Sequence, residues 1–114
     1  MKIFIPTRGR ADRQVTLSFF PDDLRKEVVL VVDHDEADEY GQYDCEIMVC
    51  PETVHDIATK RLYIHENTDD NKIVMLDDDL RFYIRKATND WHLRYLEADE
   101  YPALFGLLDK WLDD

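Results

Sequence analysis

Five consecutive apolar residues, Val28 to Val32, constrain the fold of this chain more than any other feature. Four of the five are valines, whose β-branched side chains favour extended structure. Because successive side chains of a strand point to opposite faces, an unbroken apolar run must be covered on both faces. A central strand of a parallel sheet with helices on both sides meets that requirement. We therefore expect an α/β fold.

Three further short apolar runs predict strands, and each is stopped by a proline or by acidic residues. They cover residues 2–5, 46–50 and 72–76. Helical segments alternate with these strands, which implies parallel pairing with right-handed crossovers. The sequence thus predicts a mostly parallel, Rossmann-like sheet flanked by helices.

Two helical segments are expected to connect these strands. The first covers about residues 11–20, where apolar side chains recur at a spacing of four. The second begins at Thr53, which fits the first position of a capping box, and turns His65 toward the core. On spacing alone, Lys60 and Arg61 of this second helix form a surface pair whose aliphatic stems lie along the protein.

The last third of the chain departs from this alternation. Residues 81–85 and 92–96 are expected to pair as a hairpin across Asn89 and Asp90. Apolar and aromatic side chains then follow helical spacing between Tyr101 and Leu112, which predicts an amphipathic helix. If its own sheet does not fully cover it, this helix is expected to offer an interface for a second copy or for another protein.

The length and composition are those of one small globular domain. The chain has 114 residues, 45% of them hydrophobic, and no internal repeat. We expect one domain over 1–114, in which 1–86 bind the ligand and 87–114 add a closing hairpin and helix. No apolar stretch approaches the roughly 20 residues that span a bilayer, and the start does not resemble a signal peptide. A cytoplasmic protein without a membrane partner is therefore expected.

The two cysteines agree with that compartment. Cys45 and Cys50 are five residues apart, so on one strand they point to opposite faces and cannot form a disulfide with each other. We expect two reduced thiols, at least one of them in the interior.

The formal net charge of −12 restricts the partners of the chain. Nucleic-acid binding requires a basic surface, so direct binding through this acidic surface is not expected. The positive charges are nevertheless clustered, at Arg8, Arg10 and Arg13 and again at Arg81 and beyond. A small anion can bind at such a locally basic site.

Unusual polar residues follow three of the expected strands, at the end where an α/β sheet binds its ligands. The most informative are Asp77, Asp78 and Asp79, directly after a buried strand. On extended backbone Asp77 and Asp79 point to the same side, and paired carboxylates are ligands for Mg²⁺ or Mn²⁺. Such an ion can bridge a protein to a diphosphate. A merely solvated acidic loop is the alternative.

The other strand ends offer groups for a nucleotide. Arg8 and Arg10 carry guanidinium groups that suit phosphate, and Gly9 between them lets backbone approach a ligand. A solvated basic turn explains the same residues equally well. Asp33 is suited to accept hydrogen bonds from a base or a ribose, or to cap a turn. No P-loop and no Ser/His/Asp or Cys/His arrangement is present.

Four segments, taken in order, resemble the nucleotide-binding half of GT-A-fold glycosyltransferases, and most of all phage-type enzymes thought to glycosylate modified DNA bases. The segments are 3–10, 31–33, 57–61 and 74–79, so the resemblance covers roughly residues 1–86. It implies a nucleoside-diphosphate sugar as ligand and Mn²⁺ or Mg²⁺ as cofactor. The acidic triplet corresponds to the DxD motif of these enzymes.

The resemblance also implies a role for individual residues. Asp77 contacts the sugar nucleotide and Asp79 holds the metal, with Asp77 as a further metal ligand. Nucleotide and phosphate binding falls to the first loop, the second strand end, the second helix and the triplet, namely to Thr7, Arg8, Gly9, Arg10, Asp33, Lys60, Arg61, Asp77 and Asp78. No catalytic base is identified.

The chain departs from these enzymes after the DxD strand. The enzymes carry an acceptor-binding half there, whereas only a few residues follow that strand in this chain. We therefore expect one of three cases: a piece of a longer enzyme, a half that works with a partner, or a minimal relative that has lost catalysis. The competing hypothesis is an inactive acidic protein of phage type that blocks a basic nucleic-acid-binding partner. Nucleotidyl transfer is a third, although its first loop is usually richer in glycine.

Overall fold

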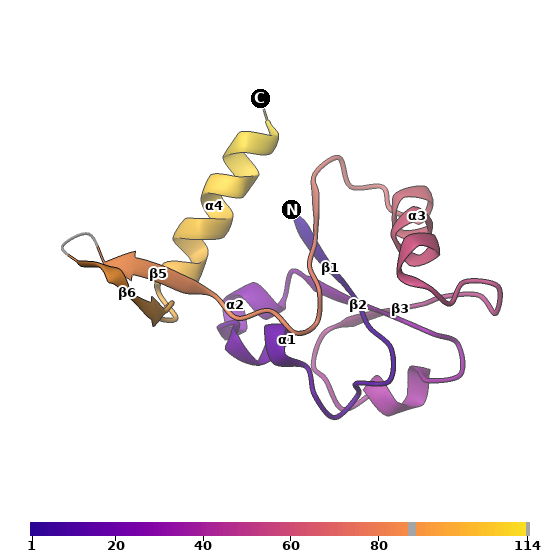
Figure 1. Cartoon of the computed structure of the whole chain (residues 1–114). Helices are drawn as coiled ribbons and strands as arrows, with labels where there is room; N and C mark the ends of the chain where they lie inside the picture. Colours follow the sequence, from indigo (N-terminus) through magenta and orange to yellow (C-terminus); the bar gives the residue numbers. More distant parts are fainter. Residues whose placement is uncertain (87–88, 114) are drawn as a thin grey trace.

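The computed structural model describes residues 1–86 and 89–113, and it contains a four-stranded, all-parallel sheet (Figure 1). The strand order is β3-β2-β1-β4. The strands are β1 (Lys2–Pro6), β2 (Val28–Val32), β3 (Glu46–Val49) and β4 (Ile73–Met75). All four strands predicted from the sequence are present, and the α/β, Rossmann-like arrangement is confirmed. Residues 87, 88 and 114, which belong to the closing element expected over 87–114, lie outside the described residues.

Strand β2 occupies the interior position that its apolar run predicts. All five of its side chains are at most 1% exposed, and it pairs with β1 on one side and β3 on the other. Val28, Leu30 and Val32 face one core, and Val29 and Val31 face the other. Because successive side chains point to opposite faces, this one strand contributes to two separate apolar layers.

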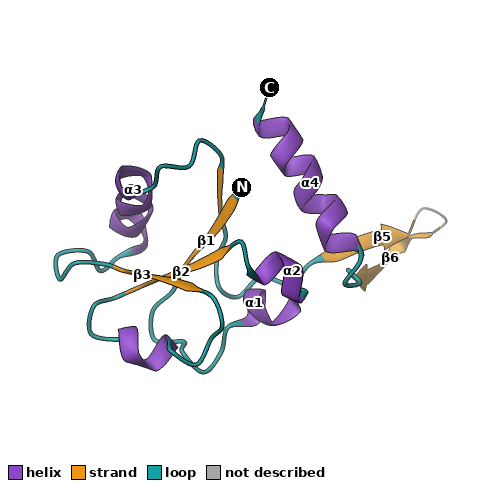
Figure 2. Cartoon of the chain, turned by 180° about the vertical axis from the view of Figure 1, so that it is seen from behind, coloured by secondary structure: helices purple, strands orange, loops and turns teal. Residues whose placement is uncertain are grey.

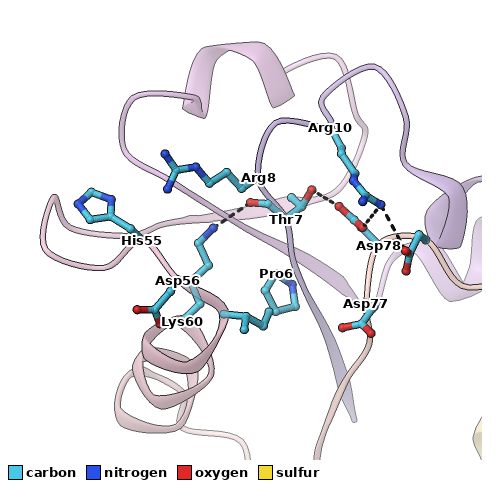
Figure 3. Close-up of a pocket in the computed structure, with 11 residues that line it drawn as sticks. Pro6, Thr7, Arg8, Arg10, His55, Asp56, Lys60, Asp77 and Asp78 are labelled. Carbon is cyan, nitrogen blue, oxygen red and sulfur yellow. Dashed lines mark hydrogen bonds and ion pairs between the residues drawn. The ribbon is translucent and has the colours of Figure 1, made fainter.

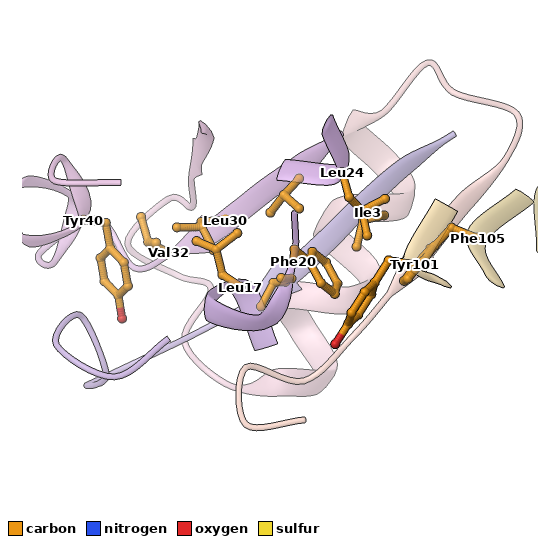
Figure 4. Close-up of a cluster of buried hydrophobic side chains, with 11 residues drawn as sticks. Ile3, Leu17, Phe20, Leu24, Leu30, Val32, Tyr40, Tyr101 and Phe105 are labelled. Atoms are coloured by element: carbon orange, nitrogen blue, oxygen red, sulfur yellow. The ribbon is translucent and has the colours of Figure 1, made fainter. Parts of the chain in front are cut away.

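Helices cover both faces of the sheet, as Figure 2 shows from behind. On one face, Ile64 of α3 packs on Phe4 and Val29. On the other face α1, α2 and α4 supply the larger cluster drawn in Figure 4, in which Phe20 contacts the rings of Tyr101 and Phe105 edge-on. The helices are α1 (Val15–Phe19), α2 (Asp22–Arg25), α3 (Ile57–Asn67) and α4 (Glu100–Leu112), with a 3-10 helix, η1, at Ala37–Tyr40.

Two helix boundaries differ from the prediction. The first helix begins at Val15 and not near residue 11, because Gln14 turns its side chain back to bond the Arg10 carbonyl and Thr7. Helix α3 begins at Ile57 and not at Thr53. Its N-cap is Asp56, which has an extended backbone and whose carboxylate accepts a hydrogen bond from the Thr59 amide at 2.7 Å. This cap places the first helical turn three residues later than expected.

The inward face of α3 also differs from the prediction. Its buried residues are Lys60 and Ile64, whereas Ile57, Leu62 and His65 are exposed. The packed His65 and the surface Lys60 expected from spacing are therefore both wrong. The shifted start of the helix does not by itself explain why Lys60 is buried. The explanation is its buried partner, Asp33.

The hairpin and the final helix are confirmed. Strands β5 (Tyr83–Lys86) and β6 (Asn89–Tyr95) pair antiparallel and lie beyond the edge of the parallel sheet (Figure 1). Asn89 and Asp90, expected in the turn, belong to β6. Helix α4 packs one side on the core and exposes Leu107, Trp111 and Leu112; the interface expected there stays a prediction.

Both cysteines are free, and Cys50 is buried, as expected. Among the described residues, no helix has both the length and the apolar character needed to cross a membrane.

Candidate functional site

A cavity of about 470 Å³ opens at the carboxyl edge of the sheet, between the loops that follow β1 and β4. The strand order reverses there: β2 and β3 are added on one side of β1, and β4 lies on the other side. Ligands of open α/β sheets bind at such a switch point. The lining consists of Pro6, Thr7, Arg8, Arg10, His55, Asp56, Ile57, Lys60, Asp77, Asp78 and Asp79.

The three aspartates of the triplet differ in environment, although all three line the cavity. Asp78 is 8% exposed, and the side chains of Asp77 and Asp79 are about half exposed, at 55% and 54%. Helix α1 holds the backbone in this conformation, because the Thr16 amide donates to the Asp78 carbonyl and the Thr16 hydroxyl donates to the Asp77 carbonyl. The outer two carboxylates are thereby left accessible to a ligand.

Thr7 connects the triplet to the first loop. Its hydroxyl donates to Asp78 Oδ2 at 2.7 Å (Figure 3). The same hydroxyl accepts a hydrogen bond from Gln14 Nε2 at 2.9 Å. The Tyr40 hydroxyl lies 3.2 Å from Thr7 Oγ1 and accepts a hydrogen bond from the Arg10 amide. Burial raises the pKa of Tyr40, so the phenol stays neutral at physiological pH. The result is a buried polar network beneath the cavity.

Arg10 bridges two carboxylates of the triplet from the first loop. Its Nη1 lies 3.1 Å from Asp78 Oδ1 and 3.4 Å from Asp79 Oδ2. Arg61 pairs in a similar way with Asp77 at 3.4 Å, although it lies outside the cavity lining. Exposed ion pairs of this kind contribute roughly 0–1 kcal/mol, so a divalent cation can displace the arginines.

Among the side chains that the structure describes, Lys60 and Asp33 carry the most deeply buried charges. They are 2% and 1% exposed, and Lys60 Nζ lies 2.5 Å from Asp33 Oδ1. Lys60 also donates to the Thr7 carbonyl at 3.1 Å, as Figure 3 shows. From the rim, Arg8 and His55 lie 3.3 and 3.9 Å from Asp33 Oδ2. The carboxylate of Asp33 thus pairs with the ammonium group of Lys60 and the guanidinium group of Arg8.

Most of the residues that the sequence singled out converge on this cavity: Thr7, Arg8, Arg10, Lys60, Asp77, Asp78 and Asp79. Gly9 does not line it. Its backbone has a φ of 66°, which favours glycine, and its amide donates to the Glu36 carboxylate. Asp33 lies beneath the lining, behind Lys60.

Sequence reasoning missed His55 and Asp56 of the lining and the supporting Gln14, Thr16 and Tyr40. The position of His55 and Asp56 just before a helix on the carboxyl edge was an available signal. The supporting residues carried none, because their partners are distant in sequence.

The charges of the lining bear on what the cavity can hold. Arg8, Arg10 and Lys60 face the four carboxylates of Asp56, Asp77, Asp78 and Asp79, so acids outnumber permanent bases. A diphosphate entering this cavity meets net negative charge unless a cation accompanies it. The carboxylates of Asp77 and Asp79 are hard oxygen donors that suit Mg²⁺ or Mn²⁺, which keep open positions for phosphate oxygens.

Among the described residues, a different group of three carboxylates has the spacing of metal ligands. Oxygens of Asp33, Asp35 and Glu36 lie within 4.8 Å of one another, a cluster that could hold a metal ion. However, Lys60 and Arg8 pair with Asp33, and the Gly9 amide bonds to Glu36. Because a metal would have to displace a buried lysine there, the exposed carboxylates of the triplet are more accessible to a cation.

The fold and the site define a Rossmann-like α/β domain of the GT-A type, with acidic and basic side chains gathered at the switch point of the sheet. The chain belongs to the family of TET-associated glycosyltransferases, because the sequence model of that family matches residues 1–112. Comparison with curated proteins and with solved structures gave no match. The family match extends beyond the 1–86 of the first resemblance and includes the hairpin and α4.

Proposed function

We propose that the cavity at the switch point binds a nucleoside-diphosphate sugar with a divalent metal, for transfer of the sugar to an acceptor. The observation that carries this proposal is the pair of half-exposed carboxylates, Asp77 and Asp79, across the cavity from Arg8 and Lys60. Membership in a glycosyltransferase family supports it.

The exposed charged side chains at the cavity divide into metal ligands and phosphate ligands in this proposal. Asp77 contacts the sugar nucleotide and, with Asp79, holds the metal. Arg8 and Arg10 approach the diphosphate from the first loop, because guanidinium groups bind phosphate oxygens in pairs. Arg61 pairs with Asp77, and it would be free to approach the diphosphate if that carboxylate held the metal.

Asp78, Thr7, Lys60 and Asp33 act from beneath the cavity. Their buried hydrogen bonds and ion pair hold the ends of β1, β2 and β4 and the start of α3 in fixed relation. Preorganised groups of this kind lose little freedom when a ligand binds. Asp33, which the sequence suggested as a direct nucleotide ligand, is here a partner of Lys60.

The metal, when bound, offsets the negative charge that develops on the departing diphosphate. The surrounding residues place that leaving group near Arg8 and Arg10 and keep it oriented by the fixed first loop. Without the cation, the four acids of the lining oppose the bound diphosphate. Binding of the nucleotide is therefore expected to depend on Mn²⁺ or Mg²⁺.

The test is the thermal stability of the protein with UDP or GDP, each with and without Mn²⁺. A ligand that binds only the native state raises the melting temperature, and the rise grows with the ratio of free ligand concentration to its dissociation constant. We expect stabilisation by one nucleotide only with metal, and its loss in Asp77→Asn and in Asp79→Asn.

Asp69→Asn is the matched control, because Asp69 is exposed in the loop before β4, at the opposite edge of the sheet. It is expected to keep the whole effect. If no nucleotide stabilises the protein with either metal, the proposal fails and a non-catalytic binding protein becomes the better hypothesis. Stabilisation that persists in both triplet variants also overturns it.

A further inference from the structure

A second cavity, of about 310 Å³, shares Arg10 and Asp79 with the first and has a different character. Its remaining lining residues are Arg13 in the first loop, Val15 at the start of α1, and Arg81 after the triplet. Its volume falls within the range of about 300–1,000 Å³ typical of small-molecule sites. Three guanidinium groups thus border a hollow that adjoins the proposed nucleotide site.

The positive charge of this cavity is not balanced by the surrounding protein. Arg10 pairs with Asp78 and Asp79, but within the described residues no carboxylate forms an ion pair with Arg13 or Arg81. Asp79 is the one acidic residue of the lining. In a chain of net charge −12, bases therefore outnumber acids three to one at this place.

The neighbouring cavities show that the surplus is local. Acids outnumber the permanent bases of the nucleotide cavity. A third cavity beside Gly9 is lined by Asp12, Glu36 and Glu39 without any lysine or arginine. The cavity lined by Arg10, Arg13 and Arg81 thus attracts an anion without a metal. The two neighbouring cavities repel an anion unless a cation is present.

We propose that the cavity between Arg13 and Arg81 is a phosphate-binding subsite for the acceptor, separate from the pocket for the nucleoside diphosphate. Guanidinium forks match the geometry of phosphate oxygens, and two of them that line one cavity can hold one phosphate group. The assignment to the acceptor rests on the function proposed above. Asp79 lines both cavities, so an acceptor anchored here is held beside the proposed metal site.

The first experiment follows the side-chain Nε–Hε signals of the arginines by NMR while inorganic phosphate is added without metal. We expect saturable shifts of the Arg13 and Arg81 signals, and a dissociation constant about fivefold weaker in Arg13→Gln or in Arg81→Gln. Because the side chains are exposed, added NaCl should weaken the binding.

Lys26→Gln is the charge-matched control. Lys26 is exposed at the end of α2, just before β2, and so lies at the amino edge of the sheet. It should leave the dissociation constant unchanged. Equal weakening in all three variants would show a general charge effect and overturn the subsite. Binding that needs Mn²⁺, or that both arginine variants retain, would overturn it too.

Two further measurements separate this subsite from the nucleotide pocket and identify the phosphate. Arg13→Gln and Arg81→Gln should keep the metal-dependent stabilisation by nucleotide, whereas Asp77→Asn should keep the metal-free phosphate shifts. Each proposal can thus fail while the other stands. Comparing methyl phosphate with dimethyl phosphate then distinguishes a phosphomonoester acceptor from a phosphodiester acceptor. If neither compound binds, the subsite is contradicted.

Discussion

Lys60 and Asp33 form a buried ion pair, with 2.5 Å between Nζ and Oδ1, at the point where α3 meets the end of β2. Lys60 also donates to the Thr7 carbonyl at the end of β1. One ammonium group therefore joins the three elements on this side of the cavity. Because a buried charge without its partner is costly, this contact is expected to fix both the stability and the shape of the site.

Removing the ammonium group tests that expectation. Lys60→Met keeps most of the side-chain volume but leaves the Asp33 carboxylate buried, so we expect the free energy of unfolding to fall by about 3–5 kcal/mol. Urea denaturation followed by circular dichroism measures it. Arg61 lies on the same helix, but its ion pair with Asp77 is exposed, so Arg61→Met should cost roughly 1 kcal/mol or less. Similar losses in the two variants would contradict a special role for Lys60.

The hydroxyl of Thr7 is the next group to test, because it joins Asp78, Gln14 and Tyr40. Thr7→Val removes the donor to Asp78 and is expected to lower the free energy of unfolding by about 1–3 kcal/mol. Thr7→Ser retains the hydroxyl and should lie much closer to the parent protein. The same denaturation experiment decides, and an unaltered Thr7→Val protein would show that the network is not stabilising.

The members of the acidic triplet should separate into two roles. Asp78→Asn alters a buried carboxylate that bonds Thr7 and Arg10, so a loss of about 1–3 kcal/mol in unfolding free energy is expected. Asp77→Asn alters a half-exposed carboxylate and should leave stability nearly unchanged while abolishing metal-dependent nucleotide binding. Thermal melts with and without Mn²⁺ show both effects. Equal destabilisation by the two changes would contradict this division.

The acid stability of the protein should depend on the contact between Arg94 and Glu100, which joins β6 to α4. Two hydrogen bonds from Arg94, and one from the Glu97 amide, lower the pKa of Glu100 from 4.5 to about 2. A lowered folded-state pKa stabilises the protein above the unfolded value, and that contribution disappears as the pH falls from 4.5 toward 2.

The measurement is the melting temperature of the parent and of Glu100→Gln between pH 7 and pH 2.5. The parent should melt higher at neutral pH, and the difference should shrink below about pH 4.5, the unfolded pKa. Arg94→Gln is the companion variant, and it should remove the same increment. A difference that stays constant over the whole range would show that this ion pair does not drive the acid response.

The two thiols should react at different rates in the native protein. Burial raises the pKa of both Cys45 and Cys50, so both are poorer nucleophiles than a free thiol at neutral pH. Cys50 is 1% exposed, whereas Cys45 is partly accessible. In Cys45→Ala and Cys50→Ala variants, a disulfide reagent such as DTNB should label Cys45 faster, with both rates rising in urea. Rapid labelling of Cys50 would contradict its buried position.

Much of the site was visible in the sequence, because strand ends are local features. The runs at 2–5 and 72–76 place Thr7 and the triplet at one edge, and the structure brings them into one cavity. The inner face of α3 was not visible. Its apolar residues suggested the wrong face, because the residue that the core accepts there is a lysine.

The sequence by itself determined the central strand, the parallel order and the acidic end of β4, since hydrophobic periodicity and chain breaks act over a few neighbouring residues. Only the tertiary structure decided that Asp78 is buried while Asp77 stays accessible, and that Lys60 lies in the interior. These outcomes depend on Thr7 and Asp33, which are far away along the chain. A buried charge requires a partner, and local sequence patterns do not identify partners at that separation.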